Sequence, residues 1–233
     1  MSLCQMLTNA ASVDAASGVG GDHGSAGRGA GTGAATMVGV VVGIVTNIKD
    51  PDNLGRVRVK FSWFSEADES EWARVATLMA GKGRGSVFLP EVDDEVLVAF
   101  EQGDMRRPFV IGALWNGVDT LPAEFANDGK NNVRLIKSRS GHLIKLDDTD
   151  GSEKIEVIDK SGKNSMVIDT KNNTITITTE KDLILRAPQG KISLEAKELE
   201  LKSSAALKVE AGSEMNVKAS ATMNIKGATV NIN

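Results

Sequence analysis

Pairs of apolar residues separated by one residue recur about every eight positions over residues 166–232. The pairs are Met166/Ile168, Ile175/Ile177, Leu183/Leu185, Ile192/Leu194, Leu199/Leu201, Leu207/Val209, Met215/Val217, Met223/Ile225 and Val230/Ile232. Residues i and i+2 share a face only in an extended strand, because they lie on nearly opposite sides of a helix. Small or turn-prone residues such as Gly212-Ser213 stand between the pairs. The pattern predicts short strands separated by bends.

Two apolar residues per unit are too few to close a core within one chain, so the repeat predicts self-association, with three chains as the natural closure. The predicted trimer core consists of Ile175, Ile177, Leu183, Leu185, Ile192, Leu194, Leu199, Leu201, Leu207, Val209, Met215, Val217, Met223 and Ile225. A helix over 192–211 is one alternative, since that segment is rich in Leu, Ala, Glu and Lys. A single-chain β-solenoid is another, but its coils carry a different internal period. The side-chain period favours strands.

Upstream of the repeat, short apolar segments alternate with turn signals. We predict strands at 38–48, 56–64, 72–78, 86–89, 95–101 and 107–114. Within the second strand, the odd-numbered Val57, Val59 and Phe61 are expected to face inward. Residues 50–55 predict a turn, 81–85 a flexible connection and 102–104 a tight hairpin. Five or six short strands predict a small β-barrel.

Composition adds a modestly acidic balance, with a formal net charge of -4, which disfavours bulk affinity for nucleic acid. No apolar run approaches the roughly 20 residues of a membrane-spanning helix. No Lys or Arg precedes Arg28, so we expect no secretion signal and synthesis in the cytoplasm. Cys4 is the only cysteine, which excludes an internal disulfide framework.

The first 36 residues are dominated by Gly, Ala and Ser, a composition that stays flexible by itself. Leu3, Met6 and Leu7 are apolar residues within this N-terminal arm. We expect them to dock on a partner subunit, which would order a tail that its own sequence cannot order.

Four segments follow the order and spacing of one family. They are GIVTNIKDPDNLGRVRVKFSWF, SEWARVATLMAG, GSVFLPEVDDEVLVAFEQGDMRRPFVIGALWN and SRSGHLIKLDDTDGSEKIEVID, beginning at residues 43, 70, 85 and 138. The chain resembles the VgrG and phage baseplate protein V group, the central spikes of contractile injection machines. The resemblance covers residues 38–233, with its most specific motifs between Gly43 and Trp115.

The resemblance implies an all-β chain in four parts: an N-terminal arm (1–37) that docks on the hub, an oligonucleotide/oligosaccharide-binding (OB) barrel (38–116), a linker (117–132) and an intertwined three-chain β-helix (133–233). It implies a structural spike that helps to pierce the target envelope on contraction, in a phage tail-like, extracellular or type VI-like apparatus. A passive central plug of the baseplate would show the same residues.

Two departures from larger family members narrow the expected role. The chain has no long hub domains before the barrel, which implies a separate hub protein and favours a phage-like tail. It has no catalytic insert and ends bluntly, which resembles spikes that seat a PAAR-type tip protein. Asn224, Val230, Asn231, Ile232 and Asn233 are the expected tip contacts.

We expect no enzyme activity, cofactor or metal. His23 lies in the N-terminal arm, and the resemblance gives His142 a structural position. No histidine follows His142, so the His-x-His iron site of some phage spikes is absent.

Three further segments resemble sites but lack their key groups. Residues 50–55 begin like a calcium loop, but Leu54 replaces the fifth-position ligand and Phe61 the bidentate Glu. Residues 81–85 lack the Gly-Lys-Ser/Thr ending of a phosphate loop. The carboxylates Glu91, Asp93 and Asp94 are expected in a solvated loop rather than in a hydrolase pair.

The rival function is single-stranded nucleic-acid binding, since OB barrels hold single strands through basic grooves and stacking aromatics. The candidate residues are Arg56, Arg58, Lys60, Trp63 and Trp72. A neighbouring acidic loop with Glu66, Asp68, Glu69 and Glu71 opposes phosphate binding. We therefore expect the charges to mediate contacts with neighbouring barrels and the hub, and both tryptophans to fill the barrel core.

Overall fold

The computed structural model describes residues 37–63, 65 and 68–232. Leu3, Met6, Leu7, His23 and Asn233, and with them the expected hub contacts, lie outside this part of the chain. The elements are β1 Val40–Asn47, β2 Arg58–Phe61, β3 Arg74–Val75, β4 Ala80–Gly81, β5 Arg84–Gly85, β6 Glu95–Phe100, the 3-10 helix η2 Glu101–Gly103, β7 Pro108–Ala113, β8 Val133–Lys137, β9 Leu143–Asp147, β10 Lys154–Ile158, β11 Ser165–Asp169 and β12 Thr174–Thr178. The predicted all-β class is confirmed.

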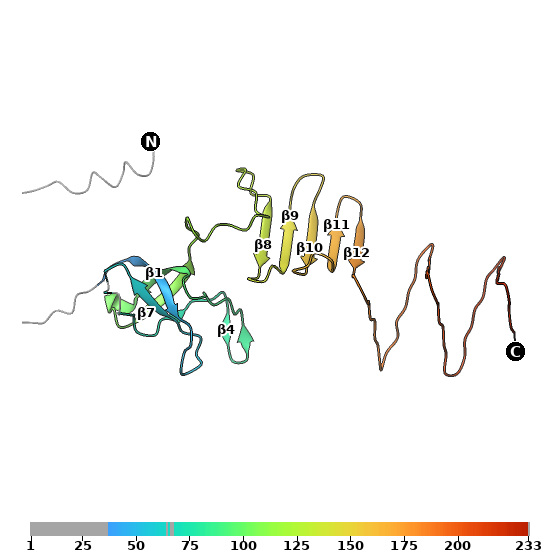
Figure 1. Ribbon diagram of the computed structural model, residues 1–233, viewed down its shortest axis with the longest axis horizontal. Coiled ribbons are helices and arrows are strands. Elements are labelled where there is room, and N and C mark those ends of the chain that lie inside the picture. The colour runs from blue at the N-terminus through green and yellow to red at the C-terminus, as the bar shows by residue number, and fades with distance from the viewer. Residues whose placement is uncertain (1–36, 64, 66–67, 233) are drawn as a thin grey trace, which may run out of the picture.

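The first sheet is a curled barrel wall with strand order β2-β1-β6-β7-β3 (Figure 1). An isolated antiparallel bridge between Val57 and Ala73 joins the two edges of this sheet beside β2 and β3. Closure of five short strands in this way is the architecture of an OB barrel. The predicted strands at β1, β6 and β7 are confirmed.

Alternate residues of the barrel strands fill its interior, as the period-2 pattern predicts. The odd-numbered residues Val57, Val59 and Phe61 are buried, which confirms their predicted direction. The core consists of Val45, Val57, Val59, Phe61, Ala73, Val96, Val98, Phe100 and Val110. Gly43 lies where β1 and β2 pack most closely, since a Cβ there would stand 2.3 Å from Val59 Cγ1. Only glycine fits this position without displacing the core.

Three sequence predictions in the barrel region are wrong. Residues 81–85 form part of the β4–β5 hairpin rather than a flexible connection, and 86–89 form no strand. Trp63 stacks on Phe61 with ring centroids 5.0 Å apart but is 46% exposed. Trp72 lies half-buried beneath Arg56 and Arg58, outside the core. Valines and Phe100 already fill the narrow interior, so the large indoles pack on its rim and outside.

The second sheet is an antiparallel meander of consecutive strands, in the order β12-β11-β10-β9-β8 (Figure 1). Each strand has five residues, and neighbouring strands pair along their whole length without a register shift. Turns close on local hydrogen bonds, such as the one from Gly162 N to Asp159 O. Identical strand lengths and an unbroken register give the sheet two continuous faces.

After β12 the chain continues as an extended zigzag that runs away from the barrel (Figure 1). Its bends fall at 180–181, 188–190, 197–198, 204–205, 212–213, 220–221 and 228. One apolar pair of the repeat lies in each extended segment between successive bends, from Leu183/Leu185 onward. Residues 192–211 contain no helix, so the helical alternative is wrong. These extended segments do not form a sheet in the single chain, because no partner strand is hydrogen-bonded to them.

Candidate assembly surface

One face of the second sheet is a stripe of apolar side chains. Strand register places Ile144, Val157, Met166 and Ile177 in a row, and a parallel row lies two residues away. The apolar stripe is defined as Ile136, Ile144, Leu146, Ile155, Val157, Met166, Ile168, Ile175 and Ile177. Apart from the half-buried Ile168, these side chains are 41–65% exposed. An apolar surface of this extent on one chain marks a site of association.

The opposite face of the same sheet carries charge. Lys145 Nζ lies 2.6 Å from Glu156 Oε2 across the β9–β10 pair and 3.4 Å from Asp147 Oδ2. The Glu156 carboxylate raises the pKa of Lys145. The linker after the barrel lies on this face, where Lys137 Nζ donates to Glu124 Oε1 at 2.7 Å. The two faces of the sheet therefore differ: one carries the Lys145 ion pairs, and the other carries the apolar stripe, with Arg134 of β8 at its edge.

The predicted core residues of the zigzag are exposed in the single chain. The fourteen sequence-predicted core residues begin with Ile175 and Ile177, which belong to the apolar stripe, and continue through the extended segments to Ile225. Residues 181–232 contain one backbone–backbone hydrogen bond, from Gly190 N to Ala187 O. An extended chain that exposes so many apolar side chains requires neighbours to bury them. The expected tip residues Asn224, Val230, Asn231 and Ile232 are exposed at the far end of the zigzag.

A shallow hollow of about 700 Å³ runs along one row of the apolar stripe, from Ile136 in β8 to Ile177 in β12. Ile136, Ile144, Val157 and Met166 line it from the sheet, and Phe88 lines it from the barrel. The turns beside it are linked to each other: Lys160 N donates to His142 Nδ1 at 3.3 Å, and Glu180 N donates to Asn164 Oδ1 at 3.0 Å. His142 is thus a hydrogen-bond acceptor between two turns, in keeping with the structural position expected for it.

The barrel and the sheet are tied together by an ion pair. Arg139, in the β8–β9 turn, donates from Nη1 to Glu91 Oε2 at 2.7 Å. Asp94 accepts a hydrogen bond from Glu91 N at 2.8 Å, which fixes the loop that carries Glu91. The Glu91 and Asp94 carboxylates therefore help to order the junction between the barrel and the second sheet. The sequence predicted only a solvated loop, because a pair 48 residues apart leaves no local signal.

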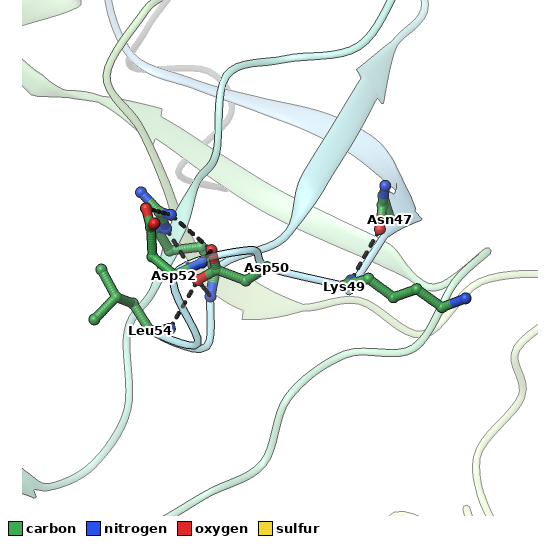
Figure 2. Close-up of polar contacts among 6 residues, drawn as sticks. Asn47, Lys49, Asp50, Asp52 and Leu54 are labelled. Atoms are coloured by element: carbon green, nitrogen blue, oxygen red, sulfur yellow. Dashed lines mark hydrogen bonds and ion pairs between the residues drawn. The ribbon is translucent and has the colours of Figure 1, made fainter.

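The loop that begins like a calcium site is closed on itself (Figure 2). Asp50 accepts hydrogen bonds from Leu54 N at 2.9 Å and from Arg56 Nη2 at 2.6 Å, and its side chain is almost wholly buried. The Arg56 guanidinium holds the pKa of Asp50 well below its usual range. Asn53 and Gly55 adopt the positive φ angles that this tight turn needs. The carboxylate is saturated by the chain's own donors, which confirms the predicted turn.

The arginines proposed for nucleic-acid binding are occupied by the chain's own groups. Arg56 pairs with Asp50 and Asp52, and Arg58 Nη1 lies 3.3 Å from Glu69 Oε2. Both guanidinium groups lie over the ring of Trp72, with the Arg58 Cζ 5.0 Å from its centroid. A single strand would have to displace the carboxylates and the arginines before it could stack on this ring.

No group of three or more His, Cys, Asp or Glu side chains among the described residues is placed to hold a metal ion. Among the same residues, no helix is long and apolar enough to span a bilayer.

The geometry defines a class of protein: a five-stranded OB barrel followed by a one-sided apolar β-structure. Residues 41–115 match the family of the type VI secretion system/phage-baseplate injector OB domain. Residues 41–115 thus belong to this OB-domain family, and this match supports the resemblance to the VgrG and phage baseplate protein V group that the motifs predict.

Several type VI secretion system spike proteins are similar to the chain. It is 32% identical to VgrG1a of Pseudomonas aeruginosa over 126 residues, which are 50% of this chain and 20% of that protein. It is 37% identical to VgrG4b of the same organism over 114 residues, or 46% and 14% of the two chains. VgrG3 of Vibrio cholerae is 33% identical over 111 residues, 45% and 11% of the two chains. The chain spans about a fifth or less of the length of these relatives.

Sequence reasoning missed the first half of the apolar stripe. Ile144/Leu146 and Ile155/Val157 are also i, i+2 apolar pairs, so the signal was present upstream of Met166. Their spacing is longer than eight because six-residue turns separate β9 from β10 and β10 from β11. The role of Phe88 beside the stripe had no such signal, since it depends on how a barrel loop meets the sheet.

Proposed function

We propose that this chain is the structural central spike of a contractile injection apparatus, and that three copies assemble through the apolar stripe and the zigzag into a needle. The observation that carries the proposal is the exposure of regularly spaced apolar residues from Ile136 to Ile232. The similarity to type VI spike proteins supports the same role.

We infer a trimer from the arrangement of the exposed apolar pairs along the zigzag. Each zigzag segment presents one apolar pair at one level, such as Leu207/Val209, and lacks walls on its other sides. Three copies in a closed ring supply two further segments at the same level, and each extended backbone gains neighbours for its N–H and C=O groups. Burial of one Leu side chain contributes about 1.5–3 kcal/mol, and the repeat multiplies this term along the needle.

The task of such a needle is mechanical. Its seven bends keep the levels in register, and interlocked chains resist bending and unfolding. We infer that sheath contraction drives the needle through the target envelope and that the chain itself catalyses no reaction and binds no cofactor. The saturated Asp50 and the structural His142 agree with this inference.

Position in the apparatus follows from the polarity of the chain. We infer that the barrel faces the tube and the hub, and that the zigzag points away from them. Asn224, Val230, Asn231 and Ile232 lie at the distal end, where a PAAR-type tip protein would sit. The protein would be made in the cytoplasm, assembled into the particle and delivered to the target on contraction.

The mass of the purified protein tests the proposal. Light scattering after size-exclusion chromatography should give three times 24.6 kDa. Leu207→Asp should abolish or weaken this trimer, because a buried carboxylate without a partner is costly. Lys208→Asp, one residue away on the outward side, is the matched control and should leave the mass unchanged. A folded monomer, or equal behaviour of the two variants, would refute the inward assignment.

Single-stranded nucleic-acid binding by the barrel is the alternative. Fluorescence anisotropy with a labelled oligonucleotide at two salt concentrations separates the two functions, since phosphate contacts weaken steeply with salt. The spike proposal expects no specific salt-dependent binding. Affinity that falls with salt, and that Arg58→Ala abolishes, would favour the alternative.

A further inference from the structure

The barrel carries a hairpin whose apolar groups are unequally covered. We define the barrel hairpin as residues 77–89, with β4 and β5 at its centre. Ser86 N donates to Met79 O at 2.9 Å, and Thr77 Oγ1 donates to Ser86 O at 2.6 Å. A Cβ at Gly85 would lie 2.6 Å from Met79 O, so the two sides meet closely. These contacts give the hairpin a defined shape.

The barrel hairpin borders the barrel and yet exposes two aliphatic side chains widely. Met79, Val87 and Leu89 line a hollow with Leu54. Leu78 is 95% exposed and Val87 is 80% exposed in the single chain. Aliphatic side chains this open on an ordered hairpin are available for contact with a partner.

The position of the hairpin identifies that partner. Phe88 borders the same hollow as Ile136 and Ile144, at the barrel end of the apolar stripe. The ion pair between Glu91 and Arg139 holds the hairpin's end to the sheet at this place. The exposed residues of the hairpin are therefore continuous with the surface that the proposed trimer buries.

We propose that the barrel hairpin of each copy seals the barrel end of the shared apolar core, with Leu78 and Val87 packed against the neighbouring copy. The inference rests on the proposed trimer. The hollow of about 700 Å³ runs along the stripe, and where it reaches Phe88 the core would be open to water at its barrel end. A hairpin that borders this surface and leaves Leu78 and Val87 widely exposed meets the next copy when the ring closes.

Charge substitution and cross-linking test the contact. Leu78→Asp and Val87→Asp should leave the mass trimeric, because the zigzag still holds the copies together. Each should lower the midpoint of thermal unfolding by roughly 4 °C or more, from the loss of one buried aliphatic group. Lys82→Asp, at the tip of the same hairpin, is the control and should shift the midpoint by less than about 1 °C.

A second measurement identifies the copy that is touched. In a Cys4→Ser background, chains with Leu78→Cys are co-expressed with chains that carry Ile144→Cys and treated with a short bismaleimide. Only a contact between copies joins one variant to the other, so we expect a heterodimer band on a denaturing gel. If the wild type is trimeric, absence of either the thermal effect or this band overturns the hairpin contact alone. A monomeric wild type overturns both proposals.

Discussion

Val157 of β10 lies directly opposite Met166 of β11, and the two side chains are 46% and 41% exposed although both are apolar. The pair stands near the centre of the apolar stripe. Its neighbours on either side, Ile144 and Ile177, are apolar as well. A cross-strand pair of this kind stabilises its sheet, but half of its surface contributes nothing until a second copy covers it.

Val157→Asp should therefore separate the copies without unfolding the sheet of one copy. Thr176→Asp is the matched control. Thr176 is exposed in β12, the strand next to β11, and lies on the face opposite the apolar stripe. We expect the first variant to lose trimer mass in light scattering and the second to keep it. A trimer that tolerated both substitutions would place the interface on another surface.

Gly43→Ala should destabilise the barrel, because the new methyl group would stand 2.3 Å from Val59 Cγ1. The expected loss is about 1–3 kcal/mol, the usual cost of forcing an extra carbon into a packed core. Tryptophan fluorescence in a guanidinium titration measures it. Gly112→Ala, in β7 with nothing within 4 Å of the added carbon, should be neutral or slightly stabilising. Equal effects at the two glycines would contradict the close packing of β1 on β2.

Asp50→Asn should loosen the turn between β1 and β2 more than Asp52→Asn does. The Asp50 carboxylate accepts from two backbone N–H groups besides Leu54 N, and from Arg56, whereas the Asp52 side chain is 65% exposed. We expect the shift in the barrel's unfolding midpoint to be at least twice as large for Asp50→Asn, on the general rule that exposed ion pairs contribute little. Similar shifts for both variants would show that the network in Figure 2 is not what holds the turn.

Acid should weaken the β10–β11 turn through Asp159. Hydrogen bonds from the Ser161 hydroxyl, and then from Asn164, lower the pKa of Asp159 to about 2. The unfolded carboxyl titrates near its ordinary value, about 3.9. A depressed folded pKa contributes stability that is fully present above pH ~4 and is lost as the pH falls toward 2. Circular dichroism melts should show Asp159→Asn less stable than wild type at pH 6, with the gap closing in acid. A gap that is constant with pH would rule out this titration.

Much of the fold could be predicted from local pattern. Alternation along β1, β6 and β7 and the inward direction of Val57, Val59 and Phe61 follow from the period of two, which each strand carries by itself. The positions of Trp63 and Trp72 could not be predicted in this way. Whether an indole enters a core depends on the volume that distant strands leave free, and Phe61, Phe100 and the valines fill it here.

The candidate site was predictable in its distal half and less so beside the barrel. The pairs from Leu183 onward stand out because bends keep them at a nearly constant spacing. Ile144 and Val157 belong to the same surface, but the six-residue turns between β9, β10 and β11 space the strands more widely than the repeat of about eight residues downstream. The contact of Arg139 with Glu91 and the approach of Phe88 to the stripe depend on residues far apart in sequence.

By itself, the sequence determined the all-β class, the bends of the zigzag and the family, because side-chain period, turn residues and motif order are local properties. Tertiary structure decided which residues meet: Glu91 with Arg139, Lys145 with Glu156, and the nine side chains of the apolar stripe on one face. Strand register fixes such meetings, and register is set by turn lengths and by packing across the whole sheet rather than by any one segment.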